Sequence, residues 1–314
     1  MKGTSNRGWR RWVMGALAWA GTAAGTWAGG TPTLYTTLPT GPYSYADGSG
    51  PAGAPDLPVP GFVGPMGEGV SNFDANGDPI NNGQSVNPAF VGWATTVVDY
   101  APANPGLIDS TWLYPNSAGN GSAPLGPATG NNFDVVSLGD LSTTDIANGA
   151  APGSITLAFN GSIVDGPGAD FVVFGNAFIL EGTSSVFCKL AYVEVSSDGV
   201  NFVPFPSVDT NPEPATEAQY GYPTEWPYAV FDPTLIYNLA GKDENAYGES
   251  WGTPFDLDQL ANSPQVLSGV LDLNNVRYVR LVEIPGSGNY TDALGDPIYD
   301  AWLATGSPGF ELQA

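Results

Sequence analysis

Residues 191–205 read AYVEVSSDGVNFVPF, and residues 274–284 read NNVRYVRLVEI. In the first stretch apolar residues occupy every second position up to the sequence Ser-Asp-Gly, which is the pattern of a half-buried β-strand. Ser-Asp-Gly is typical of a tight turn, so we expect Asp198 to be a turn residue. The second stretch is rich in β-branched and aromatic residues, as strands are.

Similar short runs recur along the chain and are separated by Gly, Pro, Asn and Asp. They lie at residues 90–100, 133–138, 154–159, 170–180, 186–196 and 276–284. Sustained helical periodicity is hard to find. We therefore predict an all-β fold, an antiparallel jelly-roll-like β-sandwich with long loops. Residues 70–314 would form this single domain, with an acidic and aromatic insertion at about residues 206–269.

The N-terminal region resembles an export signal. Four basic residues within residues 1–11 precede an apolar run at residues 12–20. This run is shorter than the roughly 20 residues that span a bilayer, which favours a secretory signal peptide over a membrane anchor. We predict a signal at residues 1–28, cleavage after Ala28, and an extended leader or linker at residues 29–69. The protein is then secreted to the extracellular cell surface and is not inserted in the membrane after cleavage.

The amino-acid composition limits the kinds of active site and binding partner that the protein can have. The 314 residues include 31 acidic and 8 basic side chains, no histidine and one cysteine. Beyond residue 28 only Lys189, Lys242, Arg277 and Arg280 are basic, so the net charge there is 4 − 31 = −27. Repulsion excludes nucleic acid and anionic membranes as partners. A chain without histidine has no Ser-His-Asp relay. We expect the single cysteine, Cys188, to be a small buried hydrophobic residue.

The motifs resemble a known family as well as a fold. The two stretches quoted first are similar to strands of the discoidin-like, galactose-binding-type jelly roll. The order DVVSLG, GSITLAF, DGPGADFVVFGNAF, SSDGVNF, TPFDLDQL and GFELQA resembles secreted bacterial cell-surface proteins that often carry a sorting tail. Gly175 stands where that family usually has Glu. The resemblance implies a β-sandwich and supplies no activity.

Two oxygen-rich loops predict a metal site. Residues 165–176 read DGPGADFVVFGN and residues 291–301 read TDALGDPIYDA. Calcium takes about six to eight oxygen ligands and tolerates irregular geometry. We expect one Ca²⁺ to hold both loops together, although these residue types also form ordinary turns. The predicted ligands are Asp165, Asp170, Asn176, Asp292, Asp296 and Asp300.

A second metal site is an alternative reading of an upstream segment. Residues 74–80, DANGDPI, match residues 292–298 in six of seven positions. Asp74, Asn76 and Asp78 alternate as in EF-hand loops, but Pro79 occupies the position where such loops need Gly. A simple turn is an equal possibility.

The predicted insertion carries aromatic residues next to acidic ones. Flat rings beside hydrogen-bonding groups suit sugar faces, but they also suit a satellite core under a long loop. The candidate ligand-binding residues are Tyr220, Tyr222, Trp226, Tyr228 and Trp251.

Three functions remain open from the sequence. The first is a non-catalytic, calcium-stabilised surface or matrix module that binds a glycan or another surface protein. The second is a self-associating subunit of a surface layer, sheath or filament, in which the leader adds a strand to a neighbour. The third is a glycoside hydrolase, because paired carboxylates need no histidine. No spacing singles out such a pair, so we expect no enzyme.

Overall fold

Strands dominate the computed structural model, which describes residues 62–63, 90–115, 123–128, 133–179, 186–212, 233–245, 251–302 and 308–314. Its α-helices are short, α1 at Thr143–Ala147 and α2 at Pro264–Leu267. Each of the named strand pairs is antiparallel. The all-β prediction is confirmed.

The largest sheet has six strands in the order β12-β8-β14-β4-β2, with β9 paired to β8. Its strands are β2 (Thr96–Ala101), β4 (Ser154–Ile163), β8 (Ala191–Ser196), β9 (Val203–Pro204), β12 (Leu239–Ala240) and β14 (Val276–Glu283). The two stretches quoted first thus lie side by side, since Val279 pairs with Val195 in β8 and with Leu157 in β4.

The turn between β8 and β9 forms as the sequence predicts. Asp198 accepts hydrogen bonds from the backbone N–H groups of Val200 and Asn201, both at 2.8 Å. Gly199 has a φ of 76°, a left-handed conformation that glycine adopts without strain. The prediction that Asp198 is a turn residue is confirmed.

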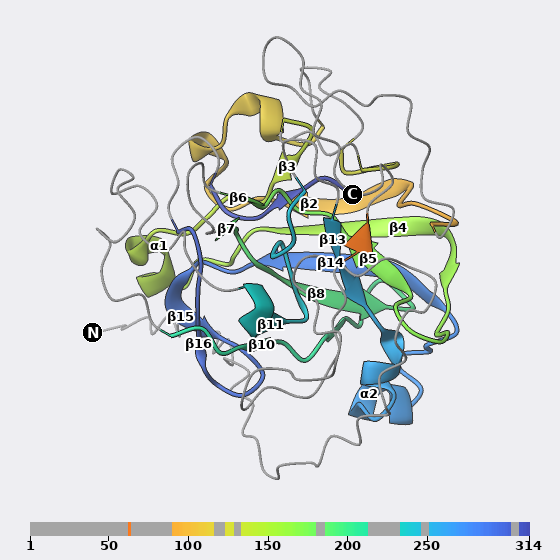
Figure 1. The fold of residues 1–314 in the computed structure, drawn as a ribbon. Coiled ribbons are helices and arrows are strands. Elements are labelled where there is room, and N and C mark those ends of the chain that lie inside the picture. Colours follow the sequence, from red (N-terminus) through yellow and green to blue (C-terminus); the bar gives the residue numbers. More distant parts are fainter. Residues whose placement is uncertain are drawn as a thin grey trace, which may run out of the picture.

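A three-stranded sheet lies across the main one. It contains β1 (Phe62–Val63), β13 (Trp251–Phe255) and β5 (Phe171–Val173), in the order β1-β13-β5. In Figure 1, β13 runs across the strands of the main sheet. The ring of Phe255 stacks on Phe171 at 5.2 Å and meets Phe205 edge-on at 5.1 Å. Val193 and Val279 of the main sheet join the same hydrophobic core.

Shorter strand pairs complete the fold. They are β3 (Val136–Ser137) with β17 (Glu311–Leu312), β6 (Phe178–Ile179) with β7 (Val186–Phe187), β10 (Val208–Asp209) with β11 (Ile236–Tyr237), and β15 (Ser287–Thr291) with β16 (Pro297–Tyr299). Within the described residues, 3₁₀ helices lie at Pro105–Leu107, Ser110–Trp112, Pro233–Leu235 and Leu257–Leu260. A second apolar cluster joins Leu190, Ile236, Leu239, Ile284 and Ile298. Of the predicted insertion, β12 pairs with β8 and β13 with β5.

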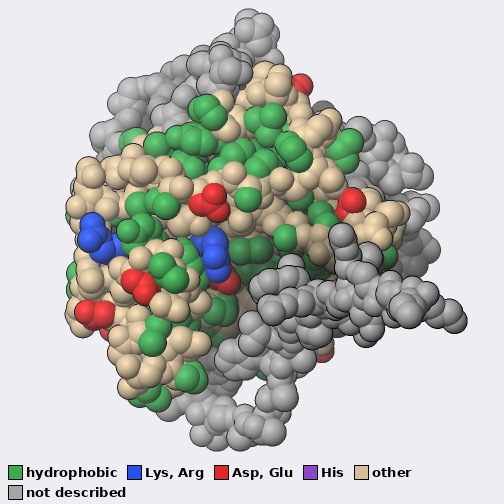
Figure 2. Space-filling view, turned by 180° about the vertical axis from the view of Figure 1, so that it is seen from behind, with side chains coloured by type: hydrophobic (Ala, Val, Ile, Leu, Met, Phe, Trp, Pro, Cys, Tyr) green, Lys and Arg blue, Asp and Glu red, His purple; other side chains and the backbone are tan. Residues whose placement is uncertain are grey.

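The interior holds many charged groups. Among the described residues, nine acidic side chains are buried: Asp134, Asp140, Asp209, Asp243, Glu244, Glu283, Asp292, Asp300 and Glu311. Lys189 and Lys242 are buried with them. The face in Figure 2 accordingly shows hydrophobic and neutral groups with scattered charges. Many of the acidic side chains therefore lie inside the fold, where burial favours the protonated form or a hydrogen-bonded or charged partner.

Cys188 is buried and unpaired by any disulfide, as expected from its apolar neighbours. No helix in the described part of the chain is both long and apolar enough to cross a membrane. The predicted signal at residues 1–28 lies outside the described residues, as does the predicted leader apart from Phe62–Val63.

Candidate metal centre

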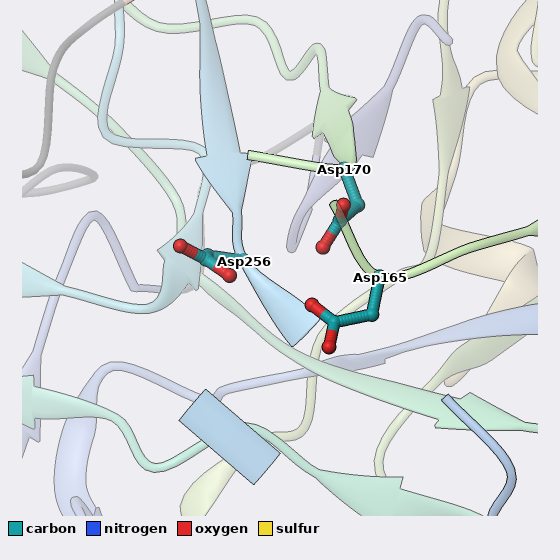
Figure 3. A group of neighbouring side chains, drawn as sticks. All are labelled: Asp165, Asp170 and Asp256. Carbon is teal, nitrogen blue, oxygen red and sulfur yellow. The ribbon is translucent and has the colours of Figure 1, made fainter. Parts of the chain in front are cut away.

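Three aspartates converge where β13 meets β5. Asp165 follows β4, Asp170 precedes β5, and Asp256 follows β13. One carboxylate oxygen from each lies within 4.8 Å of the others. Figure 3 shows the carboxylates of Asp165 and Asp170 turned toward the same space beside Asp256.

Strand pairing explains this convergence. Phe255 of β13 pairs with Phe171 of β5, and the Asp170 N–H donates to the Phe255 carbonyl at 2.9 Å. Because the strands are antiparallel, the residue before Phe171 and the residue after Phe255 emerge at the same end. The sequences Asp-Phe and Phe-Asp thus place Asp170 beside Asp256.

The Gly-Pro-Gly turn at residues 166–168 brings Asp165 to the same point. Asp170 accepts the Gly166 N–H through Oδ1 and the Leu257 N–H through Oδ2, both at 2.8 Å. Gly168 has a φ of 90°, which the tight return of the chain requires. The Asp165 N–H donates to the Leu273 carbonyl at 3.0 Å. Both ends of the loop are therefore fixed by backbone contacts.

The electrostatics of this group are unfavourable without a cation. Burial, aided by the charges of Asp256 and Asp165, raises the pKa of Asp170 to about 7 even though two backbone N–H groups lower it. Burial and the nearby Asp258 and Asp165 raise the pKa of Asp256 to about 6, against one backbone N–H. The pKa of Asp165 is also raised, first by burial and then by Asp258. No described Lys or Arg is among the causes of these shifts.

The three-aspartate group also contains a carboxylate oxygen that accepts no hydrogen bond from the described residues. Within the described chain, Oδ1 of Asp165 is buried and has no hydrogen-bond partner. Asp256 uses Oδ1 to accept the Asp258 N–H at 3.0 Å as the cap of the 3₁₀ helix Leu257–Leu260. Carboxylate oxygens with no nitrogen or sulfur ligand suit a hard cation such as Ca²⁺. The group offers such a cation three converging carboxylates.

The other predicted ligands lie elsewhere. Among the described residues, no group of three metal-binding side chains joins Asp165 or Asp170 to the acids of residues 292–300. In Figure 1, β15 and β16 lie on the opposite side of the molecule from β5 and α2. The two loops are not held at one point as predicted.

The carboxylates of Asp292 and Asp300 accept backbone hydrogen bonds elsewhere instead. Asp292 accepts the N–H groups of Leu294 and Asp296 through Oδ1, at 2.8 and 2.9 Å, and that of Asp209 through Oδ2 at 2.9 Å. Asp296 is exposed in the same turn. Asp300 is buried and accepts the Leu190 N–H at 2.7 Å. Turn hydrogen bonds account for one oxygen of Asp292, and bonds to distant segments account for its other oxygen and for Asp300.

Asn176 also lies in a different environment, because its Nδ2 donates to Glu311 Oε2 at 2.9 Å. The residue that the sequence analysis missed is Asp256. The sequence feature that could have indicated Asp256 is the pair Phe255-Asp256, which mirrors the pair Asp170-Phe171. Only the register between β13 and β5 makes that match meaningful.

Several predicted site residues cannot be placed. Asp74, Asn76 and Asp78 lie outside the described residues, as do Tyr220, Tyr222, Trp226 and Tyr228. Trp251 begins β13, but its side chain is not among those described. The second metal site and the glycan-binding aromatics stay predictions. A comparison of this chain with protein-family models and with curated proteins found no match.

Proposed function

We propose that the protein is a calcium-stabilised, non-catalytic module of the extracellular cell surface or matrix. The observation that carries this proposal is the convergence of Asp165, Asp170 and Asp256, with their raised pKa values and an unpartnered buried oxygen on Asp165. Millimolar calcium is normal outside cells, so a site of modest affinity is occupied there.

An ion at this position ties three segments together. It links the connection after β4, the start of β5 and the end of β13. If the dissociation constant is about 10 μM and external calcium about 1 mM, binding stabilises the folded state by about 2.7 kcal/mol. That is a substantial part of a net stability of about 5–15 kcal/mol.

The architecture that we propose is a jelly-roll-like β-sandwich. The packing of β13 and β5 across the main sheet through Phe255, Phe171 and Phe205 supports a two-layer arrangement. Sandwiches of this kind present loops at their ends, where a glycan or another surface protein would bind. The absence of histidine from the sequence supports binding rather than turnover.

The test is the effect of calcium on thermal unfolding and a direct titration by calorimetry. Asp165→Asn and Asp256→Asn should each remove most of the calcium-dependent rise in melting temperature. Asp272→Asn is the matched control, because Asp272 is exposed and accepts a backbone N–H of its own turn at 3.0 Å. A wild-type melting temperature that is the same in calcium and in chelator would refute the calcium site.

A further inference from the structure

Three side chains from distant segments meet away from the candidate metal centre, with Lys189 and Glu311 buried and Asn176 half-buried. Lys189 lies between β7 and β8, Asn176 between β5 and β6, and Glu311 in β17. Glu311 bridges the other two. Its Oε1 lies 3.7 Å from Nζ of Lys189, and its Oε2 accepts the Nδ2 amide of Asn176 at 2.9 Å. The side chains of Lys189 and Glu311 are only 4% and 5% exposed.

The backbone fixes Asn176 on both sides. Asn245 donates its side-chain Nδ2 to the Gly175 carbonyl at 2.8 Å and its backbone N–H to the Ala177 carbonyl at 3.0 Å. These bonds hold the carbonyls directly before and after Asn176. The amide of Asn176 therefore sits on a rigid support.

Lys189 is held in the same way. The Cys188 carbonyl accepts the Ala301 N–H at 3.2 Å, and the Leu190 N–H donates to Asp300 at 2.7 Å. Nζ lies 5.4 Å from the centre of the Phe187 ring, and Phe187 stacks on Phe178 at 4.9 Å. The amine and the carboxyl group are thus held in place with little access to solvent, and the half-buried amide contacts the same carboxyl group.

We propose that Lys189 and Asn176 become joined by an intramolecular amide bond, with Glu311 transferring the protons. This is an autocatalytic modification within one chain, and it is independent of the proposed calcium site. A primary amine and a carboxamide that contact the two oxygens of one carboxyl group supply the nucleophile, the electrophile and the general acid–base that this reaction needs.

The reaction balances without any further reagent. Glu311 takes one proton from the ammonium group of Lys189, and the lone pair of Nζ then attacks Cγ of Asn176. The Nζ–Cγ bond forms and the Cγ–Nδ2 bond breaks. A second proton passes from Nζ to Nδ2, which leaves as ammonia. No oxidation or reduction occurs.

The surroundings favour this chemistry over a permanent ion pair. Burial raises the pKa of Glu311, although Lys189 and Asn176 lower it, so the carboxyl holds a proton more readily than an exposed glutamate. Burial also raises the pKa values of Glu283 and Asp300 well above their usual range. Those two groups can stay protonated and neutral once the charge of Lys189 is lost to the amide.

Mass spectrometry of the purified mature protein tests the proposal. Under denaturing conditions the mass should be about 17 Da, one ammonia, below the value calculated from the observed N-terminus. Proteolysis should yield a branched peptide that joins Lys189 to Asn176. An unmodified mass would overturn the proposal. So would a loss of about 18 Da, which marks a carboxylate partner and released water, or an ammonia loss mapped to any other residue.

Variants assign the roles. Lys189→Arg and Asn176→Ala should each abolish the mass loss, and Glu311→Gln should slow bond formation by about 100-fold or more. Asn201→Ala is the control, since this exposed asparagine lies in the β8–β9 turn and its loss should leave the bond intact. Full bond formation in Glu311→Gln would refute its role as the acid–base. If a variant does not fold, the presence or absence of the branched peptide in the wild-type protein still tests whether the bond forms.

Discussion

The Asp256→Asn substitution should act in opposite directions with and without calcium. Asn keeps an oxygen for the hydrogen bond from the Asp258 N–H and removes the carboxylate charge. The pKa of Asp256 is about 6 instead of 3.8, mainly because of burial and partly because of Asp258 and Asp165. A pKa difference of about 2 units means that the ionised carboxylate destabilises the folded state by about 3 kcal/mol. Solvent screening of this half-buried group reduces the effect to about 1–2 kcal/mol.

The pH dependence follows from the direction of the shift. Below pH 3.8 the carboxyl is protonated in both the folded and the unfolded state, so it causes no penalty. As the pH rises from 3.8 to about 6, the unfolded state loses its proton first, and the folded state is progressively destabilised. Above about pH 6 the penalty is complete. Asp256→Asn should therefore stabilise the calcium-free protein at pH 8 and have little effect near pH 4.

Urea unfolding in chelator and in about 1 mM calcium, at both pH values, measures these effects. In chelator at pH 8 the variant should be the more stable protein. In calcium the wild type should gain about 2.7 kcal/mol, if the dissociation constant is about 10 μM, and the variant should gain almost nothing. The reasoning fails if the variant is destabilised in chelator at pH 8, or if calcium stabilises both proteins equally.

Three further substitutions test the interior. Lys242→Met should lower the free energy of unfolding in urea by about 3–5 kcal/mol. Lys242 Nζ donates to the carbonyls of Ile236 and Pro233, and its charge compensates that of the buried Asp243. A loss below about 1 kcal/mol would contradict this. Phe255→Ala should cost about 3–5 kcal/mol by the same measurement, since it leaves a cavity against Phe171 and Phe205, and a near-neutral effect would mean that the two sheets do not pack there. Gly241→Ala should destabilise the fold, because φ is 98° and a Cβ would lie 2.1 Å from the Lys189 carbonyl oxygen; an unchanged melting temperature would contradict that contact.

The strand content and the turn at Asp198 could be predicted because both depend on local pattern. Alternation in residues 191–196 places Val193 and Val195 in the core, and Ser-Asp-Gly forms the turn without help from distant residues. Cys188 was predictable for the same reason, since its apolar neighbours continue into a buried strand.

The candidate metal centre could be predicted only in part, because the position of its third carboxylate depends on pairing between distant strands. Asp165 and Asp170 share one loop, and the Gly-Pro-Gly turn between them is visible in the sequence. Asp256 joins them only through the Phe255–Phe171 register. Asp292 looked equally suitable, but three backbone N–H groups occupy its oxygens.

The group formed by Lys189, Glu311 and Asn176 was not predicted for a similar reason. Its members are separated by up to 135 positions, the distance along the chain from Asn176 to Glu311. No local pattern distinguishes Lys189 from an exposed lysine. Its burial depends on how the segment before β8 packs against β17.

A crystal structure grown with calcium tests the metal centre most directly. Anomalous difference density should show one ion at about 2.3–2.6 Å from oxygens of Asp165, Asp170 and Asp256. Empty density at that position in saturating calcium, or an ion bound instead by Asp292, Asp296 and Asp300, would contradict the proposed site.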